Sequence, residues 1–145
     1  MRFPRLRLTA ALAVVLPCFA LATSIIERPL AERARSADRV VLAQVLESQT
    51  VVLEWVPPKV EGARPTPRMI TVTKVVVGGD YKGGGPSQLE VVQLGGRAGL
   101  WEAHLPGDAT FAPGETALLL LRCRENPART RCTLVGLGEG KLQVL

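Results

Sequence analysis

The chain has 145 residues, of which 47% are hydrophobic and only 4% aromatic, and it carries 18 basic and 13 acidic side chains. Three of the arginines precede an apolar run at the N-terminus, and without them 15 basic residues face 13 acidic ones, a net charge near +2. Such a weak excess argues against nucleic acid as a partner, because binding to phosphates needs a strongly basic surface.

The first 22 residues have the pattern of a secretory signal peptide. Arg2, Arg5 and Arg7 are followed by the apolar run Leu8–Ala22, which closes on small residues. A membrane anchor is the alternative, but the run is shorter than the roughly 20 residues that a bilayer core requires. We therefore expect cleavage after Ala22, a secreted or periplasmic protein without a stable membrane span, and a single domain over residues 23–145.

The first element predicted after the leader is a short helix from Pro29 to about Ser36. Proline suits a first helical position, and Leu30, Ala34 and Ala37 recur at helical spacing. Two turns of helix are not stable alone, so the apolar stripe is expected to pack on other elements.

Strand-like runs then follow one another to the end of the chain. The predicted strands are Val40–Leu46, Thr50–Val56, Met69–Val77, Leu89–Leu94, Thr116–Cys123, Cys132–Leu137 and Lys141–Leu145. Residues 47–49 indicate either a bulge within one long strand or a tight hairpin. The unbroken run Ala117–Leu121 predicts burial on both faces, and residues 97–107 are expected to be irregular.

Two glycine clusters lie between predicted strands. Gly78-Gly79 is expected to end a strand and Gly83-Gly84-Gly85 to form a turn, and both clusters are expected to be loops with positive φ angles. A phosphate-binding loop is the alternative, but neither cluster opens into a helix or is followed by Gly-Lys-Ser/Thr.

Cys123 and Cys132 are the cysteines that remain after the leader. In an oxidising compartment two such thiols usually join, and the polar segment between them, with Asn126-Pro127, is typical of a hairpin tip. A zinc site is the competing interpretation, but two cysteines and a distant His104 cannot fill a tetrahedral shell. We expect a structural disulfide and no metal or other cofactor.

Turns at this spacing with one small helix predict a mainly β fold, a small closed or partly open OB-like β-barrel with one short N-terminal helix. The order of these motifs resembles the netrin-like domains, OB-fold barrels that include the tissue inhibitors of metalloproteinases, and uncharacterised secreted bacterial proteins. The motifs that carry the resemblance, within Leu30–Leu145, are Ala37-Asp38 before Val40–Val45, then Ile70–Val75, and Pro113-Gly114-Glu115 before Ala117–Leu121.

The chain differs from the metalloproteinase inhibitors at the N-terminal residue on which their mechanism depends. The resemblance implies a cysteine at the mature N-terminus that clasps the zinc of the target protease, but the expected start here is Thr23, with no cysteine near it. Only the fold is carried over from the resemblance.

Catalytic chemistry has one candidate group. His104 is the single histidine, and Glu102 is close enough in sequence to touch it. A second histidine and a Gly-x-Ser-x-Gly turn are both absent from the sequence, so a hydrolase centred on His104 remains a weak alternative.

Two groups of residues form a possible binding surface: Trp101, His104 and Phe111 in a Gly/Pro-rich connection, and Arg122, Arg124, Arg129 and Arg131 around the cysteines. The connection could either bind a partner across the barrel mouth or plug that end, and the arginines could either attract an acidic partner or keep a hairpin tip soluble. Few aromatic residues are available for stacking on single-stranded nucleic acid.

We therefore expect an exported, non-catalytic binding module whose partner is another envelope or extracellular protein. The alternatives are a secreted protease inhibitor that acts through an exposed loop and the hydrolase.

Overall fold

The computed structural model describes residues 28–56, 58–123 and 131–144, so the expected signal peptide lies outside the described residues. The elements in chain order are helix α1 (Leu30–Ser36), strands β1 (Arg39–Trp55), β2 (Thr66–Lys82), β3 (Gln88–Leu94), β4 (Gly96–Ala98), β5 (Trp101–Ala103), β6 (Thr116–Arg122) and β7 (Arg131–Leu134), the 3₁₀ helix η1 (Leu137–Gly140) and strand β8 (Lys141–Gln143).

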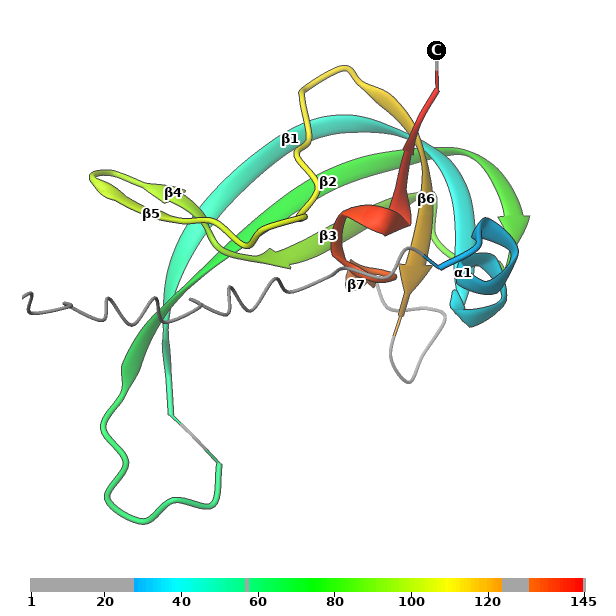
Figure 1. The fold of residues 1–145 in the computed structure, drawn as a ribbon. Coiled ribbons are helices and arrows are strands. Elements are labelled where there is room, and N and C mark those ends of the chain that lie inside the picture. The colour runs from blue at the N-terminus through cyan, green and yellow to red at the C-terminus, as the bar shows by residue number, and fades with distance from the viewer. Residues whose placement is uncertain (1–27, 57, 124–130, 145) are drawn as a thin grey trace, which may run out of the picture.

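Five strands close into a ring (Figure 1). The strand order of the main sheet is β1-β2-β3-β7-β6-β8, and β6 also pairs with β1. The neighbours β3 and β7 are parallel, and the other pairs in the ring are antiparallel. The prediction of a mainly β, barrel-like fold with one short α-helix at its start is confirmed.

The first strand is one long element, so the bulge interpretation of residues 47–49 is right and the hairpin interpretation is wrong. A register shift lies between Val45 and Glu47, and both halves of β1 pair with the same strand β2. The extra residue Leu46 bends β1 without ending it, because the partner strand continues on both sides of the bulge. The result is a two-stranded hairpin that extends well beyond the ring.

Strand β2 does not end at Gly78-Gly79, and the expectation of a turn with positive φ at these two glycines is wrong. The strand continues to Lys82 because the first residues of β1 supply hydrogen-bonding partners, with Leu42 opposite Gly79 and Val41 opposite Asp80. The β1–β2 register shifts on either side of these pairs, so the glycines lie in a bulged part of the strand and not in a turn. The later cluster behaves as predicted, since Gly83 has φ +71° and lies against the backbone of Asp38.

Residues 97–107 are not wholly irregular, which corrects a second expectation. Strands β4 and β5 form a separate antiparallel hairpin, with Ala98 opposite Trp101. Gly99, at φ +62°, takes the first of two turn positions, where a type II′ turn prefers glycine. Strands of three residues are too short for any alternation to be read from sequence.

The predicted strand Cys132–Leu137 is shorter than expected. Strand β7 ends at Leu134, and η1 begins at Leu137. Gly136 and Leu137 both have positive φ angles, 63° and 53°, which no strand accommodates. The chain then returns as β8, which pairs with β6.

The core fills the ring and confirms that β6 is buried on both faces. Leu119 and Leu121 pack with Val41, Val75 and Val91 inside the ring. Leu120 points the other way, into a smaller cluster with Ala37, Val40 and Val135. Side chains that alternate in direction along β6 thus find apolar partners on both sides.

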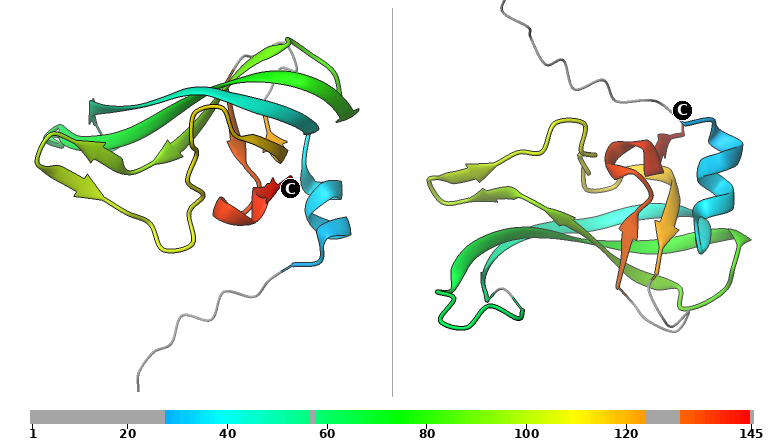
Figure 2. Two further views of the ribbon diagram at one scale, coloured as in Figure 1. Left: turned by 90° about the horizontal axis from the view of Figure 1, so that it is seen from above. Right: turned by 60° about the horizontal axis from the view of Figure 1, so that its bottom comes forward.

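Helix α1 lies at the end of the sheet opposite the projecting hairpins (Figure 2). Ala34 packs against the smaller cluster, as predicted, but Leu30 remains 48% exposed, so the expected apolar stripe is only partly covered. Polar contacts complete the docking: the Lys82 ammonium donates to the carbonyl oxygens of Ala34, Arg35 and Ala37 at 2.6–3.0 Å. These are carbonyl groups at the end of the helix, which lack partners within it.

Candidate binding surface

The β4–β5 hairpin carries the most exposed large apolar side chains of the described residues. Leu100 is 103% exposed and Trp101 is 77% exposed. The hairpin projects from the ring on the same side as the far end of the β1–β2 hairpin, as the views in Figures 1 and 2 agree. Large apolar side chains held away from the body of a protein are typical of contact surfaces.

The base of this hairpin is fixed to the long β1–β2 hairpin. The Thr71 hydroxyl donates to the Gly95 carbonyl oxygen at 2.9 Å, so it must accept the hydrogen bond that joins it to the Thr50 hydroxyl, also at 2.9 Å. A side chain on Gly96 would collide with both hydroxyls. The glycine therefore permits close approach, and the exposed tip is presented from an anchored base.

A cavity of about 220 Å³ lies where the β4–β5 hairpin meets the inner face of the sheet. Its polar wall includes Ser48, Thr73 and Gln93, and its other side includes His104 and Asp108. The polar groups largely satisfy one another: Ser48 and Thr73 share a hydrogen bond of 2.6 Å, and the Gln93 amide donates to the Asp108 carboxylate at 2.6 Å. The Gln93–Asp108 bond ties the loop after β5 to the sheet.

The two members of the suggested catalytic pair lie in different settings. Glu102 is in β5 opposite Arg97, and His104 follows the strand on the exposed rim of the cavity. Within the described ranges, no hydrogen bond or ion pair joins the His104 ring to Glu102 or to any other side chain. The arrangement provides no oriented base next to a nucleophile.

Phe111 is separated from Trp101 and packs against the core. Its ring packs against the cluster inside the ring of strands, and the Lys141 ammonium lies 4.9 Å from the ring centroid. Ala109 packs there as well. The segment around Phe111 therefore packs against the interior of the ring, whereas Trp101 is exposed on the hairpin.

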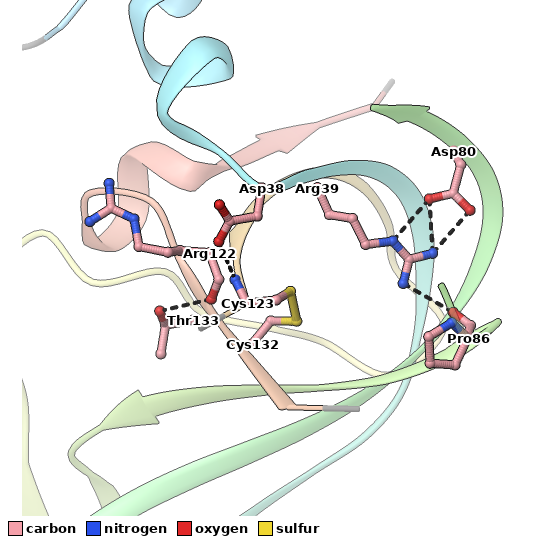
Figure 3. Close-up of a disulfide and its surroundings, with 8 residues drawn as sticks. All are labelled: Asp38, Arg39, Asp80, Pro86, Arg122, Cys123, Cys132 and Thr133. Atoms are coloured by element: carbon pink, nitrogen blue, oxygen red, sulfur yellow. Dashed lines mark hydrogen bonds and ion pairs between the residues drawn. A yellow bond between two sulfur atoms is a disulfide. The ribbon is translucent and has the colours of Figure 1, made fainter. Parts of the chain in front are cut away.

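The disulfide is present, as predicted, with the sulfur atoms of Cys123 and Cys132 1.97 Å apart (Figure 3). It connects the end of β6 to β7, and both cysteines are buried. A structural disulfide indicates an oxidising compartment, either periplasmic or extracellular.

The arginines around the disulfide do not act as one group in the part of the chain that is described. Arg131 pairs with Glu90, with 2.6 Å between Nε and Oε2, and Arg122 is exposed. Arg124 and Arg129 lie outside the described residues. The sequence alone does not indicate this ion pair, because Glu90 is distant in sequence and reaches Arg131 only through the β3–β7 pairing.

Two sets of polar contacts around the disulfide were not predicted from the sequence. The Asp38 carboxylate accepts a hydrogen bond from the Cys123 backbone N–H at 2.8 Å. Arg39, whose side chain is 3% exposed, forms a bidentate pair with Asp80 and donates to the Pro86 carbonyl oxygen at 3.1 Å (Figure 3). The one available signal was an Asp-Arg pair immediately before an apolar strand.

Across residues 28–56, 58–123 and 131–144, no three His, Cys, Asp or Glu side chains gather in a way that could hold a metal ion. In these same ranges no helix has the length and apolar character to cross a bilayer.

Comparison with known proteins identifies no relative: no protein-family model, no curated protein and no solved structure matches the chain. The netrin-like and OB-like assignment therefore remains a prediction, and the function has to be argued from the geometry alone.

Proposed function

We propose that the protein is an exported, non-catalytic binding module that contacts an envelope or extracellular protein through the tip of its β4–β5 hairpin. The observation that carries the proposal is the exposure of Leu100 and Trp101 on an anchored projection. Tryptophan combines a large apolar area with few rotatable bonds, which makes it the side chain most often central to protein interfaces. Export follows from the pattern of the first 22 residues and is supported by the disulfide.

An OB-like assignment is part of the same proposal. A five-stranded ring in which β7 returns between β3 and β6 supports it, because OB folds are five-stranded, partly open barrels of the Greek-key type. Such barrels commonly bind partners through loops and hairpins outside the ring, which is where Leu100 and Trp101 lie.

The test is a capture experiment with matched variants. The exported protein, immobilised, is incubated with the native extracellular and envelope fractions, and bound proteins are identified by mass spectrometry. Trp101→Ala should lose a protein that the native chain retains. Tyr81→Ala is the control, because Tyr81 is also an exposed aromatic residue, at 70%, but lies on β2 near the opposite end of the molecule. Equal capture by all three proteins would contradict the proposal.

A protease inhibitor is the second candidate, and the same hairpin favours it. Inhibitors of this kind insert one exposed apolar side chain into a protease pocket, and Leu100 lies at the tip of a short turn. Inhibition of a protease by the native chain and its loss in Leu100→Ala would support this function. The absence of inhibition across proteases of every mechanistic class would remove it.

A hydrolase centred on His104 is the last alternative. His104→Ala separates it from the others, since the substitution should abolish a hydrolytic activity but leave partner capture unchanged.

A further inference from the structure

The long first strand has one edge that is only partly paired. From Arg39 to Gln44 it pairs with β6, and Val45 exchanges backbone hydrogen bonds with Glu115 and Gly114 at 2.8 Å. From Leu46 onward, β2 is the only strand that pairs with β1 among the residues that the structure describes. The other edge of this segment presents unpaired backbone N–H and C=O groups, which are a template for another strand.

This edge has few of the features that usually prevent edge-to-edge pairing. Its register with β2 is regular from Glu47 to Trp55, so the bulge at Leu46 does not disturb it. The segment contains neither proline nor glycine nor lysine, and its charged residues are Glu47 and Glu54. A regular, unguarded edge of this length favours addition of a strand.

The two faces of the hairpin are chemically different. On one face the apolar side chains of Val51, Leu53, Ile70 and Val72 line part of a groove of about 230 Å³, whose other lining residues are polar or charged: Glu47, Gln49, Lys74, Glu90 and Arg131. On the other face the hydroxyl pairs Ser48–Thr73 and Thr50–Thr71 point toward the β4–β5 hairpin. An added strand must therefore match apolar residues around Val51 on the first face and hydroxyl groups on the second.

We infer that the occupant of this edge is the β1 edge of a second copy of the chain, antiparallel and related by a twofold axis through Val51. Each copy then places Val51 opposite Val51 of the other, and Gln49 opposite Leu53. The groove continues across the seam on one face, and the hydroxyl-bearing face continues on the other.

Charge complementarity supports this register. It places Glu47 of each copy opposite Trp55 of the other, and the Arg68 guanidinium lies over the Trp55 ring, 3.7 Å from its centroid. The Glu47 carboxylate, which already pairs with Lys74 at 2.7 Å, therefore approaches a second cation across the seam. A shift by one residue would turn one copy over, and one of the two such shifts sets Glu47 against Glu54.

The first test is the oligomeric state of the exported protein, measured by sedimentation equilibrium from micromolar to millimolar concentration. The native chain should dimerise. Val51→Lys sets two ammonium groups opposite each other in the apolar row and should raise the dimer Kd by at least about tenfold. Val60→Lys adds the same charge in the connecting loop, outside the paired segment, and should leave the Kd unchanged. A monomeric native chain, or a dimer indifferent to Val51→Lys, would overturn the inference.

Cysteine cross-linking tests the register itself. Under mild oxidation Val51→Cys alone should give a disulfide-linked dimer on a non-reducing gel, since opposite Cα atoms are about 4.5–5.5 Å apart in such a pair. Leu53→Cys alone should not, whereas a mixture of Gln49→Cys and Leu53→Cys should give a linked heterodimer. Linkage of Leu53→Cys as fast as Val51→Cys would refute the twofold axis at Val51. Circular dichroism and the Tm of each variant establish that it is folded.

Discussion

Arg39 is the residue whose burial the sequence least suggests. Its guanidinium donates hydrogen bonds to both carboxylate oxygens of Asp80 and to the carbonyl oxygen of Pro86, and these acceptors compensate for removing the charge from water. The pair links the first residue of β1 to the end of β2, next to the glycine turn that requires Gly83. A hydrophobicity pattern cannot reveal such a pair, because it depends on which residues the strand register sets side by side.

Asp80→Ala should lower the free energy of unfolding by about 2–3 kcal/mol, because it leaves the buried Arg39 charge with one of its partners. Urea denaturation measures the change. Lys74→Ala is the matched comparison, since Lys74 and Glu47 form an ion pair in which both side chains are more than half exposed. That variant should have a midpoint close to the native one, because exposed pairs contribute little. Equal losses in the two variants would contradict the assigned role of Arg39.

Glu115 makes the stability of the folded protein depend on pH. Its carboxylate accepts a hydrogen bond from the Ala112 backbone N–H at 3.0 Å and pairs with Lys141, and these contacts hold its pKa below the ordinary value of 4.5. A carboxyl group whose pKa is depressed by folding stabilises the folded state above pH 4.5, and this contribution disappears as the pH falls through the folded pKa.

Glu115→Gln should therefore be less stable than the native chain at pH 7, and the difference should shrink as the pH is lowered toward 3. Urea unfolding of both proteins at the two pH values tests this directly. A difference of the same size at pH 7 and pH 3 would mean that the ionised carboxylate does not contribute.

At the scale of elements, sequence patterns predicted those that are long or uniformly apolar. The run Ala117–Leu121 correctly indicated a strand with two buried faces, and Leu89–Leu94 was correct within a residue. Strand β2 was cut short because local glycine preference was overridden by pairing with β1. The β4–β5 hairpin, which carries the candidate site, was missed because each strand has only three residues.

Only part of the candidate site was predicted from the sequence. Trp101 was singled out as an aromatic residue in a Gly/Pro-rich connection, whereas Leu100 at the turn was overlooked. Phe111 was grouped with Trp101 by proximity in sequence, but the chain reverses between them and buries the Phe111 ring against the core.

Helix α1 depends on Lys82 more than on its own sequence. A helix of seven residues has too few internal hydrogen bonds to persist alone, and the Lys82 ammonium satisfies carbonyl groups at its end. Lys82→Met should cost about 0.5–1 kcal/mol of stability and increase amide hydrogen exchange in α1. Lys59→Met removes the same charge from the loop between β1 and β2 and should change neither quantity. Unchanged exchange in α1 of Lys82→Met would contradict this dependence.

For the whole molecule, ring closure brings β6 and β7 together, and the disulfide secures them. The cysteines are separated by nine positions, so the bond restricts a short loop in the unfolded chain and contributes about 2–3 kcal/mol. Replacing Cys123 and Cys132 together with alanine should lower the urea midpoint to that of the native protein unfolded with a reductant present. A variant as stable as the oxidised native chain would show that the ring does not need this link.

The central claim is that the ring serves as a support for an exposed hairpin that contacts another protein. The most direct test is a photo-reactive benzoylphenylalanine placed at position 101 and, as control, at position 81, in cells that export the protein. Irradiation should join position 101, but not position 81, to one other envelope or extracellular protein. Adducts from both positions, none from position 101, or adducts that contain only this chain would contradict the claim.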